Sequence, residues 1–304
     1  MRKIVFMMML SLLLFTQCKK ENVDTNAEEM VPIRLEVPMD KSRSDFSELF
    51  PSGKICWGND KNVEYVYLAV PYALDFCDVS MGYYTQHLGI LFEMKADVEE
   101  RMDKLVFEGR IHTNALARKD NCMIYYFGNN GNGGVGTNVT TYYKKISDVN
   151  IIGKKITFDK QTGSLEKIGD YHLAKAFVKV RKNVDDSGNI ISYDLSIESF
   201  TSITSFAMLD LDRMTKLEGS AAKLKSFTLM WTEDYVFEEI YEYDSLGYID
   251  VSNNEGRKCL ISLLPTKESV ALECIRGKYE FPEGIRSNQV YLGKNGGVLE
   301  WGRP

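Results

Sequence analysis

Residues 191–198 read ISYDLSIE, and this stretch decides the fold class. Ile191, Tyr193, Leu195 and Ile197 alternate with polar side chains. Because successive side chains of a strand point to opposite faces, the alternation predicts a β-strand with one buried and one solvated face. A slip of one residue would exchange the two faces, so the pattern also fixes the register of this strand.

Similar short runs continue in both directions and predict a mostly β protein. They are rich in β-branched and aromatic residues, and Gly, Asn, Asp and Pro clusters separate them about every ten residues, which is typical of β-sandwiches. Further strands are expected over residues 31–37, 63–70, 105–112, 122–127, 172–180, 227–232 and 235–241. One short helix is expected over residues 97–104, where a polar connection fits the sequence equally well.

The length and one polar segment predict two domains. At roughly 150 residues per domain, 304 residues favour two domains over one. Residues 159–164 are polar and rich in turn formers, and a fresh set of strands begins at Tyr171, which indicates a boundary near residue 165. We therefore expect two tandem β-sandwich domains, residues 31–165 and 166–304.

The composition is that of an ordinary globular protein. Hydrophobic residues make up 44% and charged residues 26% of the chain, and the formal net charge is −6. Outside the first twenty residues there is no long basic run, whereas nucleic-acid binding normally requires a concentrated positive surface. We therefore expect no nucleic-acid partner.

The amino terminus has the pattern of an export signal. A short cationic start precedes an apolar run over residues 4–15, which is too short to span a bilayer, so residues 1–17 are predicted to be a signal peptide. The run ends in LFTQC and resembles a bacterial lipoprotein box, which predicts lipidation of Cys18. Gln17 stands where a small residue is usual, so the alternative is an ordinary signal peptide cut nearby. Residues 18–30 would form a flexible tether, and Lys19-Lys20-Glu21 resembles a tag for the outer face of the outer membrane.

Sequence patterns for catalysis or cofactors are weak. Residues 131–136 match GxGxxG, but the β-branched and aromatic residues 137–143 favour a strand where dinucleotide binding requires a helix, so a loop between strands is expected. Neighbouring carboxylates such as Glu238-Glu239 would point to opposite faces of a strand and could not act as a catalytic pair. There is no GxSxG elbow and no CxxC, and the three histidines are isolated. We expect no enzyme activity, no cofactor and no metal.

Two cysteines near the carboxyl end predict a hairpin. The apolar runs 258–264 and 269–275 flank the turn 265–268, and pairing Cys259 with Cys274 places their apolar neighbours on one face. Opposite residues of an antiparallel pair lie close enough for a disulfide, although two buried thiols would pack equally well there. The hairpin is the prediction, and the disulfide stays open.

The last residues are predicted to be the most functional element of the chain. Residues 289–292 and 298–301 flank the turn Gly293–Gly297, which contains Asn-Gly, a strong hairpin signal. The strand formed by Val298, Leu299, Glu300 and Trp301 could therefore fold back and complete its own sheet. Alternatively, it could be withdrawn and serve as a donor strand for a neighbouring molecule. The short turn favours the folded-back state.

Several short motifs resemble the fimbrillin family, the lipoprotein-derived subunits of type V pili and their accessory proteins. Residues 43–46 (RSDF) resemble the arginine-serine element near the start of the first domain, and residues 56–60 (CWGND) resemble a tryptophan-containing turn before the next strand. Residues 123–127 (MIYYF) are similar to an aromatic strand of the family, without its usual proline. Residues 171–180 followed by 191–197 resemble the start of the second domain. The resemblance covers most of the mature chain.

This resemblance implies two sandwiches of the transthyretin-like or immunoglobulin-like kind and a role at the cell surface. In polymerising members a protease cuts after an arginine near the amino terminus, a strand leaves, and a neighbour's strand fills the groove by β-strand addition. Arg43 is the better candidate for this cut because Arg34 lies in an expected strand. The implied partners are other fimbrial subunits or a host or bacterial surface ligand, together with the membrane through the lipid.

Two functions follow as hypotheses. The first is an outer-membrane surface lipoprotein that acts as a fimbrial accessory subunit, as anchor or tip, or as an adhesin-type subunit. The second is a surface glycan-binding lipoprotein of a nutrient-uptake system, in which the three tryptophans Trp57, Trp231 and Trp301 would stack on sugar rings. For Trp231, which is in phase with Phe227 and Leu229, a place in a sandwich core is the stronger expectation.

Overall fold

The computed structural model shows an all-β chain, as the sequence predicted. It describes residues 30–38, 44–45, 54–55, 63–70, 90–97, 104–113, 116, 122–128, 139–146, 149–158, 161–210, 216–231, 237–243, 247–252, 258–274, 277–281, 283–293, 297–298 and 300–302. Within these ranges the only helical elements are two 3-10 helices, η3 (Leu165–Tyr171) and η4 (Ala221–Lys223). A pair of two-residue strands, β2 (Ser44–Asp45) and β3 (Lys54–Ile55), forms a separate small sheet.

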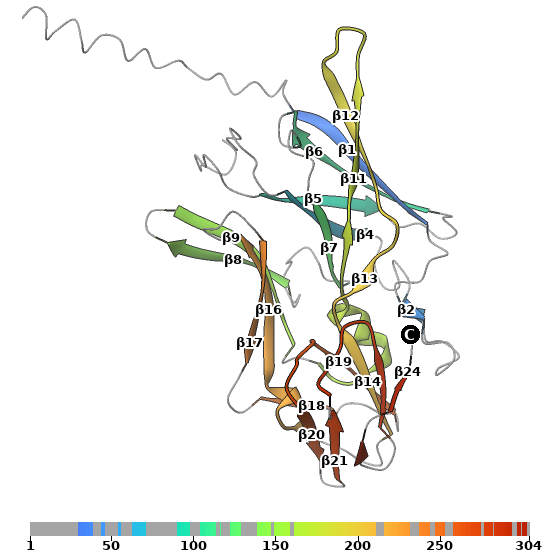
Figure 1. Ribbon diagram of the computed structural model, residues 1–304, viewed down its shortest axis with the longest axis vertical. Coiled ribbons are helices and arrows are strands. Elements are labelled where there is room, and N and C mark those ends of the chain that lie inside the picture. The colour runs from blue at the N-terminus through green and yellow to red at the C-terminus, as the bar shows by residue number, and fades with distance from the viewer. Residues whose placement is uncertain are drawn as a thin grey trace, which may run out of the picture.

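The largest element is a nine-stranded sheet in the upper part of Figure 1. β1 lies inside this sheet although it is the first strand of the chain. In spatial order the strands are β11 (Lys179–Val184), β12 (Ile190–Ser196), β1 (Met30–Pro38), β6 (Lys104–His112), β5 (Ile90–Asp97), β4 (Val63–Val70), β7 (Met123–Phe127), β10 (Leu173–Phe177) and β13 (Thr201–Ser202).

One face of the nine-stranded sheet encloses its own core. Alternate residues of β1, β4, β5, β6, β7 and β12 pack into a single apolar cluster, which includes Leu35, Leu68, Phe107 and Tyr193. Since these residues come from strands far apart in one sheet, the sheet curves around the cluster. Figure 1 shows these strands together in the upper part of the molecule.

The opposite face of the central strands is covered by a flanking sheet. This sheet has the order β17 (Phe237–Tyr243), β16 (Leu224–Trp231), β9 (Val149–Thr157) and β8 (Val139–Ile146). Phe127 of β7 packs against Tyr67 and against Phe227 of β16, with ring centroids 5.5 and 6.2 Å apart. β4 and β7 are therefore buried on both faces, and their sequences are almost continuously apolar.

Two further sheets form a terminal sandwich, which occupies the lower part of Figure 1. The first has the order β19 (Lys258–Leu263), β14 (Ser205–Asp210), β22 (Val290–Gly293) and β24 (Glu300–Gly302). The second has the order β18 (Tyr248–Asp250), β15 (Lys216–Glu218), β20 (Val270–Cys274), β21 (Gly277–Phe281) and β23 (Gly297–Val298). Residues of both sheets, such as Ile261 and Leu272, share one buried core.

The expected strands are confirmed with boundary shifts of a few residues. The run 172–180 is divided into β10 and β11 at Val178, and β8 confirms that a strand follows the glycine-rich run 131–136, which itself lies outside the described residues. For the expected helix 97–104, both end residues belong to strands and residues 98–103 lie outside the described residues.

One detail of the deciding stretch is wrong. Tyr193 and Leu195 are buried as predicted, but Ile191 is 51% exposed. β12 pairs with β1 only over residues 193–195, so Ile191 lies beyond the end of that pairing, in the hairpin that projects at the top of Figure 1. A register shift in the same hairpin, between Asn183 and Val184, also changes the phase of the facing strand.

The predicted boundary at residue 165 does not separate two sandwiches. β10 to β13 follow this position, yet they belong to the same sheet as β1. β16 also follows it and pairs with β9. The terminal sandwich is built from strands after residue 204, with β16 and β17 returning to the flanking sheet. A polar, turn-rich segment is typical of a connection between strands, but it does not determine which sheet the next strand joins.

The described part of the segment that suggested the boundary, residues 161–164, is buried or half-buried and bonded to β19. Gln161 is 4% exposed, its Nε2 donates to the carbonyl of Ser262 at 3.0 Å, and its Oε1 accepts from the amide of Ser262 at 2.6 Å. The carbonyl of Gly163 accepts from the amide of Leu260 at 3.0 Å. A side chain at Gly163 would also collide with the sulfur of Cys259, because φ is +74° and a Cβ would lie 2.3 Å from it. This segment is a fixed connection between the sandwiches.

Candidate functional site

The two predicted processing positions lie on either side of β1. Cys18 and Arg43 themselves lie outside the described residues, and Arg43 directly precedes β2. A cut after Arg43 would therefore separate β1 from the rest of the nine-stranded sheet. We call the position of β1 between β12 and β6 the slot.

β1 is held in the slot along its whole length on one side. It pairs antiparallel with β6 from Met30 opposite His112 to Pro38 opposite Lys104. On the other side it pairs parallel with β12 over residues 33–35. Every other pairing described in this sheet is antiparallel. β1 is thus a strand inserted between two later strands.

The inward side chains of β1 seal the core of the sheet. Val31, Ile33, Leu35 and Val37 are at most 7% exposed and belong to the cluster on the concave face. Full burial of such a side chain stabilises a protein by about 1.5–3 kcal/mol, so the four together contribute roughly 6–12 kcal/mol. That value is comparable to the whole stability of a typical domain, so an empty slot is not a stable state.

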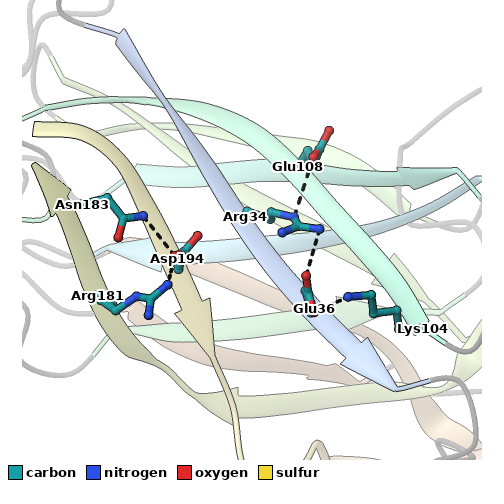
Figure 2. Close-up of polar contacts among 7 residues, drawn as sticks. All are labelled: Arg34, Glu36, Lys104, Glu108, Arg181, Asn183 and Asp194. Atoms are coloured by element: carbon teal, nitrogen blue, oxygen red, sulfur yellow. Dashed lines mark hydrogen bonds and ion pairs between the residues drawn. The ribbon is translucent and has the colours of Figure 1, made fainter. Parts of the chain in front are cut away.

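The outward side chains of β1 form ion pairs with the neighbouring strands (Figure 2). Glu36 accepts from Lys104 of β6 at 2.7 Å and lies 2.8 Å from Arg34. Arg34 also lies 3.9 Å from Glu108 of β6. On the other side of β1, Asp194 of β12 accepts from two side chains of β11, Arg181 at 2.5 Å and Asn183 at 3.0 Å.

These contacts lower the pKa values of two carboxyl groups. The hydrogen bond from Lys104, with a smaller contribution from Arg34, holds the pKa of Glu36 below its ordinary value. The hydrogen bonds from Asn183 and Arg181 lower the pKa of Asp194, and the positive charge of Arg34 adds to this. Both carboxylates are therefore charged at neutral pH. Glu36 belongs to β1 and binds Lys104 of β6, whereas Asp194 of β12 lies beside Arg34 of β1.

The carboxyl-terminal segment folds back, as predicted, but it pairs with two sheets. Glu300 and Trp301 of β24 pair antiparallel with Leu292 and Tyr291 of β22. Val298 of β23 pairs instead with Glu280 of β21, in the facing sheet. Leu299, between the two short strands, lies outside the described residues. Residues 297–298 thus lie at the edge of one sheet of the terminal sandwich and residues 300–302 at the edge of the other. We call residues 297–302 the closing segment.

The predicted cysteine hairpin is wrong. Cys259 of β19 pairs with Leu209 of β14, whereas Cys274 of β20 pairs with Gly277 of β21. Cys259 is a buried free thiol whose pKa is raised to about 12 by burial, so it is not bonded to Cys274. The apolar alternation of the two strands was interpreted correctly, because both face one core. However, they face each other across two sheets, which stack about 10 Å apart, instead of lying side by side.

Several other expectations concern side chains that the structure does not describe. Trp57 lies outside the described residues, and only the backbone is described at Trp231 and Trp301. Nowhere in the described ranges do three or more His, Cys, Asp or Glu side chains gather as metal ligands would. No helix of the described part is long and apolar enough to span a membrane.

The charged residues around β1 were not singled out from the sequence. Arg34 and Glu36 alternate with apolar residues in the sequence, but their partners on β6 and β12 lie 68 or more positions away along the chain. Comparisons with known proteins add no relative: no family model matches this sequence, and no curated protein is significantly similar to it.

Proposed function

We propose that this chain is an outer-membrane surface lipoprotein of the fimbrillin kind, and that it acts as a fimbrial accessory subunit, anchor or tip, or as an adhesin-type subunit assembled by β-strand addition. The lipid on Cys18 carries the precursor to the cell surface. A cut after Arg43 then releases β1, and a strand of another subunit takes its place in the slot.

The observation that carries this proposal is the place of β1. It is the first described strand, it precedes Arg43, and it lies between two strands that follow it in the chain. Such a strand can leave without unthreading any later element. Its departure opens the edges of β6 and β12 at once, and main-chain hydrogen bonds along both edges can bind an incoming strand.

The closing segment supports an accessory role over a stalk role. A stalk subunit must accept a strand and also donate one. Here the closing segment pairs with Tyr291 on one sheet and with Glu280 on the other, so both of its short strands are used within the molecule. A subunit that accepts a strand and keeps its own closing segment terminates a fibre.

The test is a substitution at the proposed cut. We expect Arg43→Ala to leave the protein at the surface of its own cells as an intact lipidated monomer, absent from the detergent-resistant subunit ladder that wild type enters. Lys41→Ala, a neighbouring cation in the same polar stretch, is the control and should enter the ladder normally. Normal entry of the Arg43→Ala protein would contradict the proposal.

A further inference from the structure

A row of alternating charges crosses five strands on the outward face of the nine-stranded sheet. Its members are directly opposite one another in the strand register: Arg181 with Asp194, Asp194 with Arg34, Arg34 with Glu108, and Glu108 with Lys95. They belong in order to β11, β12, β1, β6 and β5, and their signs alternate from positive to negative along the whole row. Figure 2 shows four of the five members, all except Lys95.

Arg34, the central member of this row, is the only member that β1 contributes. Arg34 lies between the carboxylates of Asp194 and Glu108, one on each side of the slot. With strands about 4.8 Å apart, these two carboxylates stand roughly 10 Å from each other across the slot. When β1 leaves, they lose the cation between them, while Arg181 and Lys95 remain on the outer sides.

The apolar pattern of β1 cannot fix its position by itself. Inward residues at 31, 33, 35 and 37 repeat every second residue. A slip of two positions therefore still points either four apolar side chains (residues 33, 35, 37 and 39) or three of them with Glu29 toward the core. The charged row distinguishes these registers. A slip in one direction places Glu36 between Asp194 and Glu108, which brings three carboxylates together, and a slip in the other places the uncharged Pro32 there.

We propose that Asp194 and Glu108 are the specificity-determining residues of the slot. They select a strand that carries a lysine or arginine at the position of Arg34, between inward apolar residues, and they disfavour a strand with an acidic residue there. The partner is thus a strand of another protein with the pattern apolar–cation–apolar. This inference rests on the proposed function, because it assumes that the slot accepts a strand from another molecule.

The same rule excludes the closing segment of a second copy of this chain. The segment reads GVLEWG over residues 297–302. With Leu299 and Trp301 inward, Glu300 faces outward. When Glu300 occupies the position of Arg34, it lies between the carboxylates of Asp194 and Glu108. In a second register, Glu300 takes the position of Glu36 and lies next to Lys104. Two of the four inward positions are then occupied by Asn295 and Gly297. The slot therefore discriminates against self-assembly.

The experiment uses the full-length chain with a specific protease site placed in residues 39–43. After the cut, a fluorescent peptide of residues 28–40 is exchanged into the slot under mild denaturant and its binding is measured by anisotropy. The Arg34→Lys peptide should bind within about two-fold of the wild-type peptide. The Arg34→Glu peptide should bind about ten-fold more weakly at low salt, and most of this difference should disappear in 1 M NaCl, where the Debye length is about 3 Å.

A charge reversal in the protein provides the complementary test. In an Asp194→Lys, Glu108→Lys double variant the preference should invert, so that the Arg34→Glu peptide binds more tightly than the Arg34→Lys peptide. Glu198→Lys is the matched control, because Glu198 is an exposed carboxylate near the end of β12 that pairs with Lys179 outside the row. This control should keep the wild-type preference.

The outcomes separate the two claims. Equal binding of the Arg34→Lys and Arg34→Glu peptides would overturn the charge selection and leave strand addition intact. Failure of the cut chain to take up any peptide would overturn strand addition and, with it, the selection. Strong binding of a peptide of residues 293–304 would overturn the discrimination against self-assembly.

Discussion

Gln161 provides the sharpest test of how the two sandwiches are joined. Its buried carboxamide bonds to both backbone groups of Ser262 and also donates to the carbonyl of Phe158 at 3.3 Å. Gln161→Leu keeps most of the side-chain volume but removes these hydrogen bonds. The buried backbone N–H and C=O of Ser262 then lose their partner at residue 161. An unsatisfied buried polar group destabilises a protein by about 1–3 kcal/mol, so we expect the free energy of unfolding to fall by about 3 kcal/mol.

The assay is urea and thermal unfolding followed by circular dichroism. At about 2–4 °C per kcal/mol for a chain of 150–250 residues, the melting temperature should fall by roughly 6–12 °C. Lys267→Leu is the control, because Lys267 is exposed in the turn before β20 and its substitution should change the stability by less than about 0.5 kcal/mol. If Gln161→Leu changes stability no more than this control does, segment 161–164 is a loose linker and the reasoning is wrong.

Two further predictions concern the closing segment and the charged face. Deleting residues 298–304 should lower the melting temperature because it opens the edges of β21 and β22; an unchanged melting temperature together with lost fibre incorporation would identify a donor strand instead. The pKa of Glu36 is lowered in the folded state, so its contribution to stability is present above its ordinary pKa of 4.5 and is lost as the pH falls through that value and below it. Lys104→Gln should therefore make the loss of stability between pH 5 and 3 shallower in acid titrations, and an unchanged slope would contradict the assigned contact.

The positions of the strands could be predicted from the sequence because they depend on local patterns. The alternation in β1 and in β12 states which side chains face a core, and the structure buries Leu35 and Leu195 accordingly. The prediction that Ile191 is buried was wrong because burial also requires a neighbouring strand, and β1 does not pair with that part of β12. The turn-rich composition of residues 159–164 predicted a domain boundary, and the strands that follow it instead return to the sheet of β1.

Strand pairing could not be predicted in the same way because it is a non-local property. The runs around Cys259 and Cys274 have the correct phase for a hairpin, and the same phase suits two strands that face each other across a sandwich. Local alternation cannot distinguish these arrangements. The candidate site illustrates this limit, since the role proposed for Arg34 depends on Asp194 and Glu108, which only the fold brings beside it.

The central claim is that the slot of β1 is where this protein joins another. The most direct measurement is the mature amino terminus, determined by mass spectrometry, in each band of the detergent-resistant ladder from the protein's own cell surface. The account predicts that chains in the ladder begin at Ser44, without β1, and that the monomer band retains residues 18–43. A ladder whose chains still carry β1, or surface protein that is entirely monomeric and uncut, would contradict it.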